Sequence, residues 1–514
     1  MDHAVTPNGP RTLVLHPTDT VGVALTVLEV GAMTAQGAAA RTRVPKGHKF
    51  ALRSVEPGSA ILKFGQVIGF ASQRIEAGDW VHEHNCAMAS DITRDYDFCT
   101  AATPVDLLPP DKASTFQGYR RPNGRIGTRN YLGILTSVNC SASVARFIAE
   151  AVNRSGILAD FPGVDGVVPF AHGTGCGMGS RGEGFDILKR TQWGYASNPN
   201  LAGVLLVGLG CEVFQIGRMK EIYGISDSDA FQTFTIQERG GTARAIEHGV
   251  AKVKEMLPLA QKARRETVSA SELVLALQCG GSDGYSGITA NPALGYAADL
   301  VVQHGGTAVL AETPEIYGAE HLLTRRAVSR EVGEKLVQRI RWWEEYTRRN
   351  GDEMNNNPSP GNKAGGLTTI LEKSLGAAAK GGTTPLTAVY EYAEQVREKG
   401  FVFMDTPGYD PVSVTGQVAG GANVLCFTTG RGSAYGNKPV PSLKLATNTE
   451  VYARMTDDMD INCGDIADGE MTVEEKGREI FQAILRVASG EATKSEQLGY
   501  GDNEFVPWQV GATM

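Results

Sequence analysis

The chain has 514 residues, enough for roughly three or four domains at about 150 residues each. Hydrophobic residues make up 42% and charged residues 21%, which is ordinary for a globular protein. The net charge of -8 is spread along the chain and argues against a nucleic-acid-binding protein, which would show a clustered basic face. It leaves room for a small anionic substrate, because a local arginine cluster can bind one.

The amino-terminal residues contain no apolar segment of the kind found in secretion signals. No apolar run approaches the roughly 18–20 residues that cross a membrane. We therefore expect a cytoplasmic protein that does not enter a membrane, and we interpret its eight cysteines as thiols.

Residues 11–98 predict a small β-rich domain. Short apolar runs such as Val21–Val27 and Ile61–Phe64 alternate with turn sequences such as Glu56-Pro57-Gly58. Residues 99–117 contain three prolines and few core residues, so we interpret them as a linker.

After the linker, apolar strands alternate with helical stretches, which predicts an α/β fold with largely parallel sheets. We divide this part into a first lobe, residues 118–354, and a second lobe, residues 355–514. The segment Asn355–Gly366 reads NNNPSPGNKAGG and predicts no regular structure. It suits either a linker between the lobes or an active-site loop.

Five predicted strands end in small polar clusters. Ligands of open α/β sheets bind beyond the carboxyl ends of the strands, so parallel strands would bring these clusters to one crevice. One cysteine there is readily explained as a small buried hydrophobe, whereas four beside glycine and polar groups favour a metal or thiolate role for at least two. The clusters contain Cys140, His172, Cys176, Cys211, Glu212, Cys279, Ser282, Asp283 and Glu312.

The β-rich domain carries histidines in two turns. His48 and Lys49 lie in the sequence PKGHK, and His82 and His84 lie two apart in VHEHN, hence on one face of a strand. Neutral imidazoles suit Fe²⁺, Mn²⁺ or Zn²⁺. The alternative is that His82 and His84 are ordinary surface residues.

Two arginine groups are candidates for binding an anion. Arg120, Arg121, Arg125 and Arg129 fall within ten residues, and Arg431 follows a predicted strand. An arginine fork matches a carboxylate. If both groups face the crevice, they bind an acidic group at each end of the substrate. Otherwise one of them only braces a turn or a domain contact.

A nucleotide site has weaker support. The segment Gly177–Gly182 matches G-x-G-x-x-G, but the acidic residue expected roughly 20 residues later is missing, and the chain has no P-loop. An NAD(P)-dependent oxidoreductase is therefore kept only as an alternative.

Longer motifs run through nearly the whole chain. They are GHK at 47–49, VHEHN at 81–85, GYRRPNGRIGTRNY at 118–131, NCS at 139–141, HGTGCG at 172–177, GLGCE at 208–212, CGGSDGYSGITANPALG at 279–295, ETPEIYGAEHLLTRRA at 312–327, NPSPGNKAGGLT at 357–368, EKSLGA at 372–377, MDTPGYDP at 404–411 and FTTGRGS at 427–433. In this order they resemble the altronate/galactarate dehydratase family. One departure is Asn198-Pro199-Asn200, where we expect His-Pro-Asn.

The resemblance implies a SAF-like β-clip domain, α/β catalytic domains and a divalent metal. We expect Fe²⁺, with Mn²⁺ and an iron–sulfur cluster as alternatives, and a homo-oligomer. The family also resembles the two-subunit sulfolactate sulfo-lyases. Here the two parts are fused, which favours the sugar-acid branch and keeps the sulfo-lyase as an alternative.

The implied reaction is dehydration of a sugar acid, an aldonate or an aldarate, to a 2-keto-3-deoxy acid. It removes the proton α to a carboxylate and expels the β-hydroxyl through an enediolate, which a bound metal would stabilise. Candidate acid–base residues are His48, Lys49 and His172. Candidate metal ligands are His82, His84, Cys140, Cys176, Cys211, Glu212 and Cys279. Candidate substrate-binding residues are Arg125, Arg129, Asn130, Ser282, Asp283, Asn362, Lys363 and Arg431.

Overall fold

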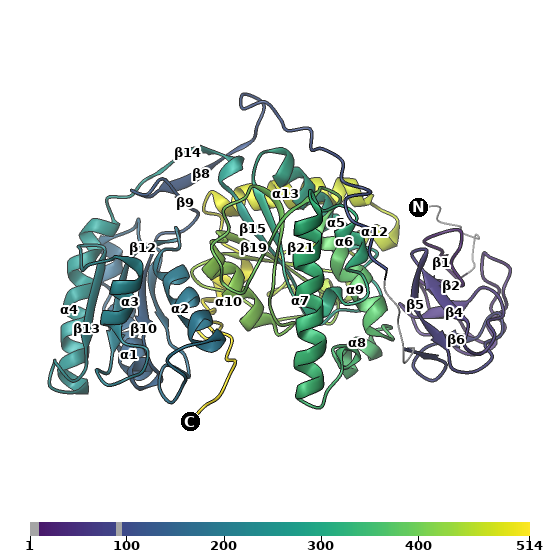
Figure 1. Ribbon diagram of the computed structural model, residues 1–514. Coiled ribbons are helices and arrows are strands. Elements are labelled where there is room, and N and C mark those ends of the chain that lie inside the picture. Colours follow the sequence, from purple (N-terminus) through teal and green to yellow (C-terminus); the bar gives the residue numbers. More distant parts are fainter. Residues whose placement is uncertain (1–9, 89–94) are drawn as a thin grey trace.

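The computed structural model describes residues 10–88 and 95–514, which form three bodies in a row (Figure 1). A small β-rich domain lies at one end, a large α/β domain in the middle and a second α/β domain at the other end. Across the described ranges, no helix is both long enough and apolar enough to cross a membrane.

The amino-terminal domain consists of two small antiparallel sheets. Two segments of this domain pass very close to each other at Gly78. This residue has φ +89°, and a Cβ there would lie 1.9 Å from the Ala39 carbonyl oxygen, so glycine is required. One sheet contains β1 (Thr12–Leu13), β2 (Val21–Ala24), β3 (Lys49–Ala51) and β6 (Trp80–Val81), and the other contains β4 (Ala60–Lys63), β5 (Gln66–Ala71) and β7 (Cys86–Ala87).

The second domain is built on a four-stranded parallel sheet of order β11-β10-β12-β13. Alternate residues of the central strand β10 face opposite ways. Leu132 and Ile134 pack under α1 and α4, and Leu135 packs under α2 and α3. The elements are β10 (Tyr131–Thr136), α1 (Ala142–Arg154), β11 (Gly166–Phe170), α2 (Glu183–Ala196), β12 (Leu201–Gly208), α3 (Ile216–Tyr223), β13 (Phe231–Thr235) and α4 (Thr242–Ala260).

A three-stranded antiparallel sheet connects the second and third domains. It contains β8 (Thr115–Arg120), β9 (Ile126–Gly127) and β14 (Arg265–Ser269), in the order β14-β8-β9. The chain therefore enters and leaves the second domain through neighbouring strands, which lie above the two α/β domains in Figure 1.

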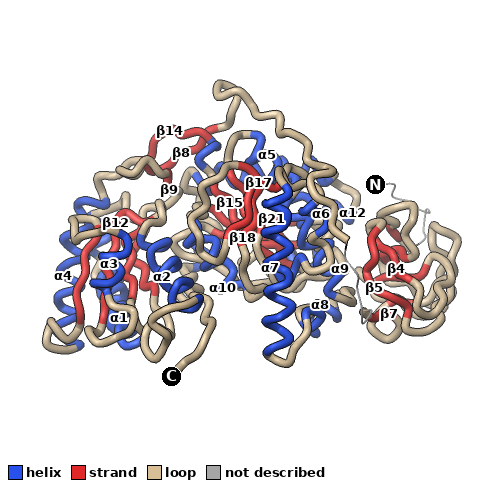
Figure 2. Tube along the Cα trace, in the orientation of Figure 1, coloured by secondary structure: helices blue, strands red, loops and turns tan. Residues whose placement is uncertain are grey.

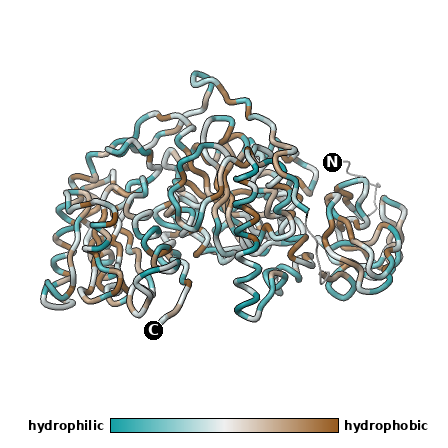
Figure 3. Tube along the Cα trace, viewed as in Figure 1, coloured by the Kyte–Doolittle hydropathy of each residue, from teal (hydrophilic) through white to brown (hydrophobic). Residues whose placement is uncertain are grey.

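The third domain contains a seven-stranded parallel sheet of order β17-β18-β16-β15-β19-β20-β21. Figure 2 shows its strands flanked by helices, and Figure 3 shows hydrophobic segments running through the interiors of both α/β domains. The strands are β15 (Val274–Cys279), β16 (Thr307–Leu310), β17 (Leu386–Tyr390), β18 (Gly400–Met404), β19 (Val424–Thr429), β20 (Ser442–Ala446) and β21 (Ile461–Asn462).

The helices of this domain cover both faces of the sheet. Leu275 and Leu277 face α5 (Ala290–Gln303), α7 (Arg330–Arg349), α9 (Ile370–Ala378) and α13 (Val473–Ala488). Ala276 faces the other way, toward α10 (Asp410–Gly420), whose far side packs on α2 of the second domain. Shorter helices are α6 (His321–Thr324), α8 (Pro360–Ala364), α11 (Thr449–Arg454), α12 (Asp465–Asp468) and α14 (Lys494–Leu498).

The segment Asn355–Gly366 corrects one prediction, because it contains regular structure. Helix α8 begins at Pro360. Ser359 caps it in a reciprocal capping box with Asn362, and proline suits the first helical position because it needs no N–H there. The motif S-P-G-N carried this signal, which the asparagine- and glycine-rich composition obscured.

The predicted fold class, a β-rich domain followed by α/β domains with parallel sheets, is confirmed. The seven-stranded sheet takes strands from both sides of residue 354, so the division predicted there falls within the segment that supplies one sheet.

Candidate active site

A buried group of charged side chains lies at the carboxyl edge of the third-domain sheet. Cys279 ends β15, and its Sγ lies 3.6 Å from Glu312 Oε2 and 3.3 Å from Glu315 Oε2. The three ligand atoms lie within 4.8 Å of one another, so this is a candidate metal-binding triad. Glu312 adopts φ +69°, a conformation that non-glycine residues take at a cost when the surroundings hold them there.

The donor types of this triad suit a divalent metal, but its charges do not. The Lys380 Nζ donates to both Cys279 Sγ and Glu312 Oε2, at 2.7 Å each, and is fully buried. Burial alone would lower the pKa of Lys380, but the neighbouring Cys279 and Glu312 raise this pKa above its usual value. Lys380 therefore remains an ammonium. Burial also raises the pKa of the Cys279 thiol. The ammonium thus provides the positive charge that a metal would provide, and the triad does not fit a metal while Lys380 occupies it.

The amino-terminal domain docks beside this edge through a buried ion-pair group. Lys49 Nζ donates to Glu372 Oε2 at 2.8 Å and to the Gly366 carbonyl at 2.6 Å, and Lys63 Nζ donates to Glu372 Oε1 at 2.9 Å. Against the opposite effect of burial, the two ammonium groups lower the pKa of Glu372. Lys49, predicted as an acid–base residue, is thus engaged in the domain contact.

His48 lies in the same interface with both ring nitrogens in contact. Its Nδ1 accepts from Trp80 Nε1 at 3.2 Å, and its Nε2 lies 3.3 Å from the Ala364 carbonyl. Because an indole N–H only donates, neutral His48 carries its proton on Nε2. Burial, followed by the Lys49 charge, lowers the pKa of His48 to about 4. The imidazole is therefore neutral at pH 7.

His82 is the second imidazole of this group, with its ring centroid 5.1 Å from that of His48. Burial and Lys49 lower the pKa of His82 to about 4 as well. Its Nδ1 is buried and has no hydrogen-bond partner among the described residues. His84 is more exposed and lies against Trp80, with ring centroids 5.3 Å apart.

A cavity of about 110 Å³ adjoins His48, because Ala364 lines it and also contacts the imidazole. The loops after β15, β19 and β20 form its wall, and Lys46 comes from the amino-terminal domain. Lys46, Arg431 and Arg454 give it three cationic side chains, and Lys46 pairs with Glu450 at 2.7 Å. Within residues 10–88 and 95–514, Arg431 forms no ion pair. This cavity suits a carboxylate.

Asp283 orders the cavity wall. Its Oδ1 accepts from Ser286 and Thr447 hydroxyls at 3.0 and 2.9 Å, and its Oδ2 accepts from Asn448 Nδ2 at 3.0 Å. Gly430 is required beside it, since a Cβ there would lie 2.1 Å from Asp283 Cγ. Burial raises the pKa of Asp283.

Three other predicted binding residues lie around the same loops. Asn362 Nδ2 donates to the Ser282 carbonyl at 2.8 Å, which ties α8 to the loop after β15. Lys363 pairs with Glu83 of the amino-terminal domain at 2.6 Å. Ser282 and Lys373 line a small neighbouring cavity, and Lys373 connects it to Glu315 at 2.8 Å.

The first arginine group does not reach this cavity. Arg129 forms a two-pronged ion pair with Glu496, at 2.6 and 2.8 Å, and Arg125 donates to the Ser197 carbonyl at 2.9 Å. Asn130 accepts from Arg121 at 2.7 Å and donates to the Gly163 carbonyl. These residues brace the junction of the α/β domains, so the structure does not bring the two arginine groups together.

The remaining predicted residues lie on the second domain, at the carboxyl edge of its sheet. His172 Nε2 contacts the Thr136 carbonyl at 2.7 Å, and its Nδ1 accepts from Thr174 N at 3.2 Å. Burial lowers the pKa of His172 to about 4. Glu212 accepts from the amides of Leu209 and Gly210. This edge also carries Cys140, Cys176 and Cys211.

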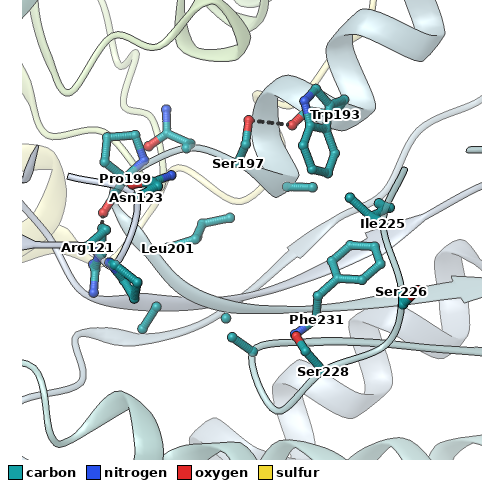
Figure 4. Close-up of a pocket in the computed structure, with 16 residues that line it drawn as sticks. Arg121, Asn123, Trp193, Ser197, Pro199, Leu201, Ile225, Ser226, Ser228 and Phe231 are labelled. Carbon is teal, nitrogen blue, oxygen red and sulfur yellow. Dashed lines mark hydrogen bonds between the residues drawn. The ribbon is translucent and has the colours of Figure 1, made fainter. Parts of the chain in front are cut away.

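A larger cavity, of about 370 Å³, opens at the opposite, amino-terminal edge of that sheet (Figure 4). Arg121 lines it, but its guanidinium donates to the carbonyls of Pro199 and Arg129. Asn198, the departure from the family motif, also lines it and donates to the carbonyls of Val418 and Ala422. The cavity contains no acid–base pair, so we do not assign it to catalysis.

The site contains residues to which the sequence analysis gave no role. Trp80, Glu315, Glu372, Lys373 and Lys380 are the main ones. Glu315, Glu372 and Lys373 lie inside quoted motifs, which was the available signal. Lys380 lies outside all of them.

Three family models match the chain in succession. The Altronate/galactarate dehydratase SAF domain matches residues 10–89, the D-galactarate dehydratase/Altronate hydrolase second domain matches 118–261, and the D-galactarate/Altronate dehydratase C-terminal domain matches 270–513. The predicted SAF character of the first domain is thereby confirmed.

Similar proteins extend over nearly the full length. The galactarate dehydratase (L-threo-forming) of Escherichia coli (strain K12) is 39% identical over 499 residues, 94% of each chain. The altronate dehydratase of Bacillus subtilis (strain 168) is 36% identical over 506 residues, 97% of this chain and 99% of that one. A (2R)-sulfolactate sulfo-lyase subunit beta of Chromohalobacter salexigens is 33% identical over 399 residues, 77% of this chain and 97% of that one. The chain therefore belongs to the altronate/galactarate dehydratase family.

Proposed function

We propose that this protein is a lyase that dehydrates a sugar acid, an aldonate or an aldarate, to a 2-keto-3-deoxy acid. Family membership supports the reaction class, since relatives at 39% and 36% identity are named as dehydratases of galactarate and altronate. The observation that carries the assignment of the site is the neutral His48 beside a cavity with three cationic side chains.

The substrate carboxylate binds against Arg431, with Arg454 as a second cation, whereas Lys46 is paired with Glu450 and Asp283 is held by hydrogen bonds in the wall. Removing the α-proton converts this carboxylate into an enediolate with a second negative charge. Fixed cations that face developing charge stabilise it more than they stabilise the ground state. The cavity therefore favours proton removal at the carbon beside the bound carboxylate.

The imidazole pair His48 and His82 carries the proton transfers. The α-proton passes to a neutral imidazole of this pair, since the lowered pKa keeps both rings uncharged and their centroids lie 5.1 Å apart. His48 carries its proton on Nε2, beside the cavity wall, and donates a hydrogen bond to the β-hydroxyl, which leaves as water with the proton removed from the α-carbon. The resulting enol then tautomerises to the 2-keto acid.

The expected Fe²⁺ or Mn²⁺ has no assigned step at the Cys279 triad, because the Lys380 ammonium already pairs with two of its three ligand atoms. Lys49 and Glu372 act in this proposal by holding the amino-terminal domain, and with it His48, against the third domain.

The test is 2-keto acid formation from matched six-carbon aldonates and aldarates, assayed anaerobically with Fe²⁺ present. His48→Asn should lower kcat/KM by about 10²–10⁴-fold, the usual contribution of an acid–base group. His16→Asn, an exposed histidine, is the matched control and should leave kcat/KM unchanged. Full activity of His48→Asn would contradict the assigned site. Sulfite release from sulfolactate, without 2-keto acid from any sugar acid, would favour the sulfo-lyase alternative that the 33% identical relative raises.

A further inference from the structure

Three of the four exposed cysteines lie on one edge of the second domain. Cys140 follows β10, Cys176 lies in the loop after β11, and Cys211 follows β12. These strands are neighbours and run parallel, so their carboxyl ends share one edge of the sheet. The fourth exposed cysteine, Cys99, lies outside this domain, and Cys86, Cys279, Cys426 and Cys463 are buried.

The three cysteine-bearing loops are bonded to one another pair by pair. Asn139 N donates to the Thr174 carbonyl at 2.9 Å, which joins the loops of Cys140 and Cys176. Phe214 N donates to the Gly175 carbonyl at 3.1 Å, which joins the loops of Cys176 and Cys211. Ser137 Oγ donates to Glu212 Oε1 and closes the set. The backbone around the thiols is therefore fixed.

Glycine makes this approach possible. Gly175 has φ +99°, and a Cβ there would lie 2.2 Å from the Ser137 carbonyl oxygen and 2.8 Å from Val138 Cα. No other residue lets the Cys176 loop lie this close to the end of β10.

The other metal-ligating groups of this edge are already used. His172 contacts backbone through both ring nitrogens, and Glu212 accepts from Ser137 and from two backbone amides. Both residues hold the loops in place. The three thiols remain, with Gln237 Nε2 3.6 Å from Cys211 Sγ as a donor to sulfur. This leaves a donor set of sulfur alone, which selects soft metals and iron–sulfur clusters.

The distances between the sulfur atoms distinguish a site for a single metal ion from a site for an iron–sulfur cluster. Sulfurs bound to one ion at about 2.3 Å lie within about 4 Å of one another. Among the described residues, only Cys279, Glu312 and Glu315 form a group within 4.8 Å, so the three exposed thiols are more widely spread. In a cubane cluster each thiolate binds a different iron, which suits such spreading.

We propose that Cys140, Cys176 and Cys211 bind a [4Fe–4S] cluster, with one iron left without a protein ligand. Each thiol loses its proton as its sulfur bonds to iron. The free iron would be open to an oxygen ligand such as a hydroxyl or a carboxylate. The site is distinct from the buried Cys279 triad and does not depend on the dehydratase assignment, because the inference uses only the geometry of the thiols.

The carboxyl-terminal tail covers one side of this edge. Met514 N donates to the Gly177 carbonyl at 2.7 Å, and Thr513 pairs with Met178. Figure 1 shows the chain ending beside the second domain. The tail therefore lies next to the Cys176 loop.

The experiment is anaerobic reconstitution of the full chain with equal amounts of Fe²⁺ and Fe³⁺ and with sulfide, followed by desalting; a [4Fe–4S]²⁺ cluster contains two of each iron, so no further oxidant is needed. Iron and acid-labile sulfide are counted, and visible absorption and electron paramagnetic resonance spectra are recorded. Wild type should retain about four irons and four sulfides per chain. Cys140→Ser, Cys176→Ser and Cys211→Ser should each retain less than about a quarter of that, because one of only three protein ligands is lost. Circular dichroism checks that these variants, changed at exposed side chains, keep their fold.

Two controls locate the cluster. Cys99→Ser tests an exposed thiol elsewhere, and Cys279→Ser tests the buried triad; both should retain the wild-type iron and sulfide. Retention of the cluster in the triple variant of Cys140, Cys176 and Cys211 would overturn the proposal. So would its loss in Cys279→Ser, or binding of iron without sulfide by wild type. None of these readouts measures turnover, so failure here leaves the dehydratase test unaffected.

Discussion

The carboxyl edges of the second-domain and third-domain sheets have similar sequences, but their cysteines lie in opposite environments. Each parallel sheet has cysteine at or just after the end of a strand, next to glycine, serine or glutamate. On the third domain, Cys279 is buried against Lys380, Glu312 and Glu315, and the amino-terminal domain docks close by. On the second domain, the thiols of Cys140, Cys176 and Cys211 are exposed.

The difference lies in the partners. At the buried edge, an ammonium neutralises the acidic groups, which closes that edge to a second cation. At the exposed edge, the hydrogen bonds of the loops involve backbone, His172 and Glu212, and they leave the sulfur atoms available. We therefore expect metal chemistry at the exposed thiols and not at Cys279, where Lys380 shares the site.

Removal of the Lys380 ammonium should strongly destabilise the third domain. Lys380→Met leaves Glu312 buried without its cation, and breaking a buried pair costs about 3–5 kcal/mol. Urea unfolding at pH 7 measures the loss. Lys252→Met, which removes a surface pair with Glu255, is the matched control and should cost under about 1 kcal/mol.

The same variant tests whether a metal competes with the ammonium. Added Mn²⁺ should raise the melting temperature of Lys380→Met, since Cys279 and Glu312 then lack their paired cation and only Glu315 keeps one, Lys373. It should leave wild type unchanged at that site. A stability loss below about 1 kcal/mol would show that the buried edge does not depend on this charge pairing.

Acid should destabilise the second domain more than it destabilises the third domain. His172 titrates near pH 4 in the folded protein and near 6.5 when unfolded, so the unfolded chain binds the extra proton between these values. The contribution of neutral His172 to the free energy of unfolding is complete above about pH 6.5 and falls by up to about 3 kcal/mol toward pH 4.

Asp410 gives the stability of the third domain the opposite dependence on pH. Burial and Glu315 raise its pKa to about 7, so the folded state takes up a proton as the pH falls, and this contribution to stability rises. Hydrogen exchange at pH 7 and pH 5 should show β10–β12 losing protection relative to β15 and β16. His172→Gln should reduce that difference, and equal losses in the two domains would contradict it.

Thiol labelling gives the smallest expected effect and the most direct view of the two edges. In native, metal-free protein, Cys99, Cys140, Cys176 and Cys211 should react quickly with a disulfide reagent, because the reagent reaches exposed thiols. Cys279, whose pKa burial raises, should react only after unfolding. After reconstitution, protection of the three second-domain thiols with Cys99 still reactive is expected; unchanged reactivity of Cys140 would argue against its ligand role.

Much of the fold could be predicted from apolar patterning. The run Tyr131–Val138 contains β10, and Val204–Leu209 overlaps β12, because buried parallel strands are continuous apolar segments. Helix α8 was missed because glycine and asparagine outweighed a four-residue capping motif.

The candidate site was predictable by residue type but not by partner. His48, Asp283 and Arg431 lie around one cavity, as motifs at turns and strand ends suggest. Nothing in local sequence reveals that Arg129 pairs with Glu496, or that Lys380 occupies the Cys279 triad. Long-range charge pairing decides which arginine or cysteine is free, and it depends on packing between elements distant in the chain.

The ion pairs of Lys49 and Lys63 with Glu372 join two domains of one chain. His48 and Lys46 belong to the small domain, while Asp283, Arg431 and Arg454 belong to the large one. The cavity is therefore complete only where the two domains are docked. The connecting segment keeps the small domain at a high effective concentration beside its partner, so the two halves remain associated at any dilution of the protein.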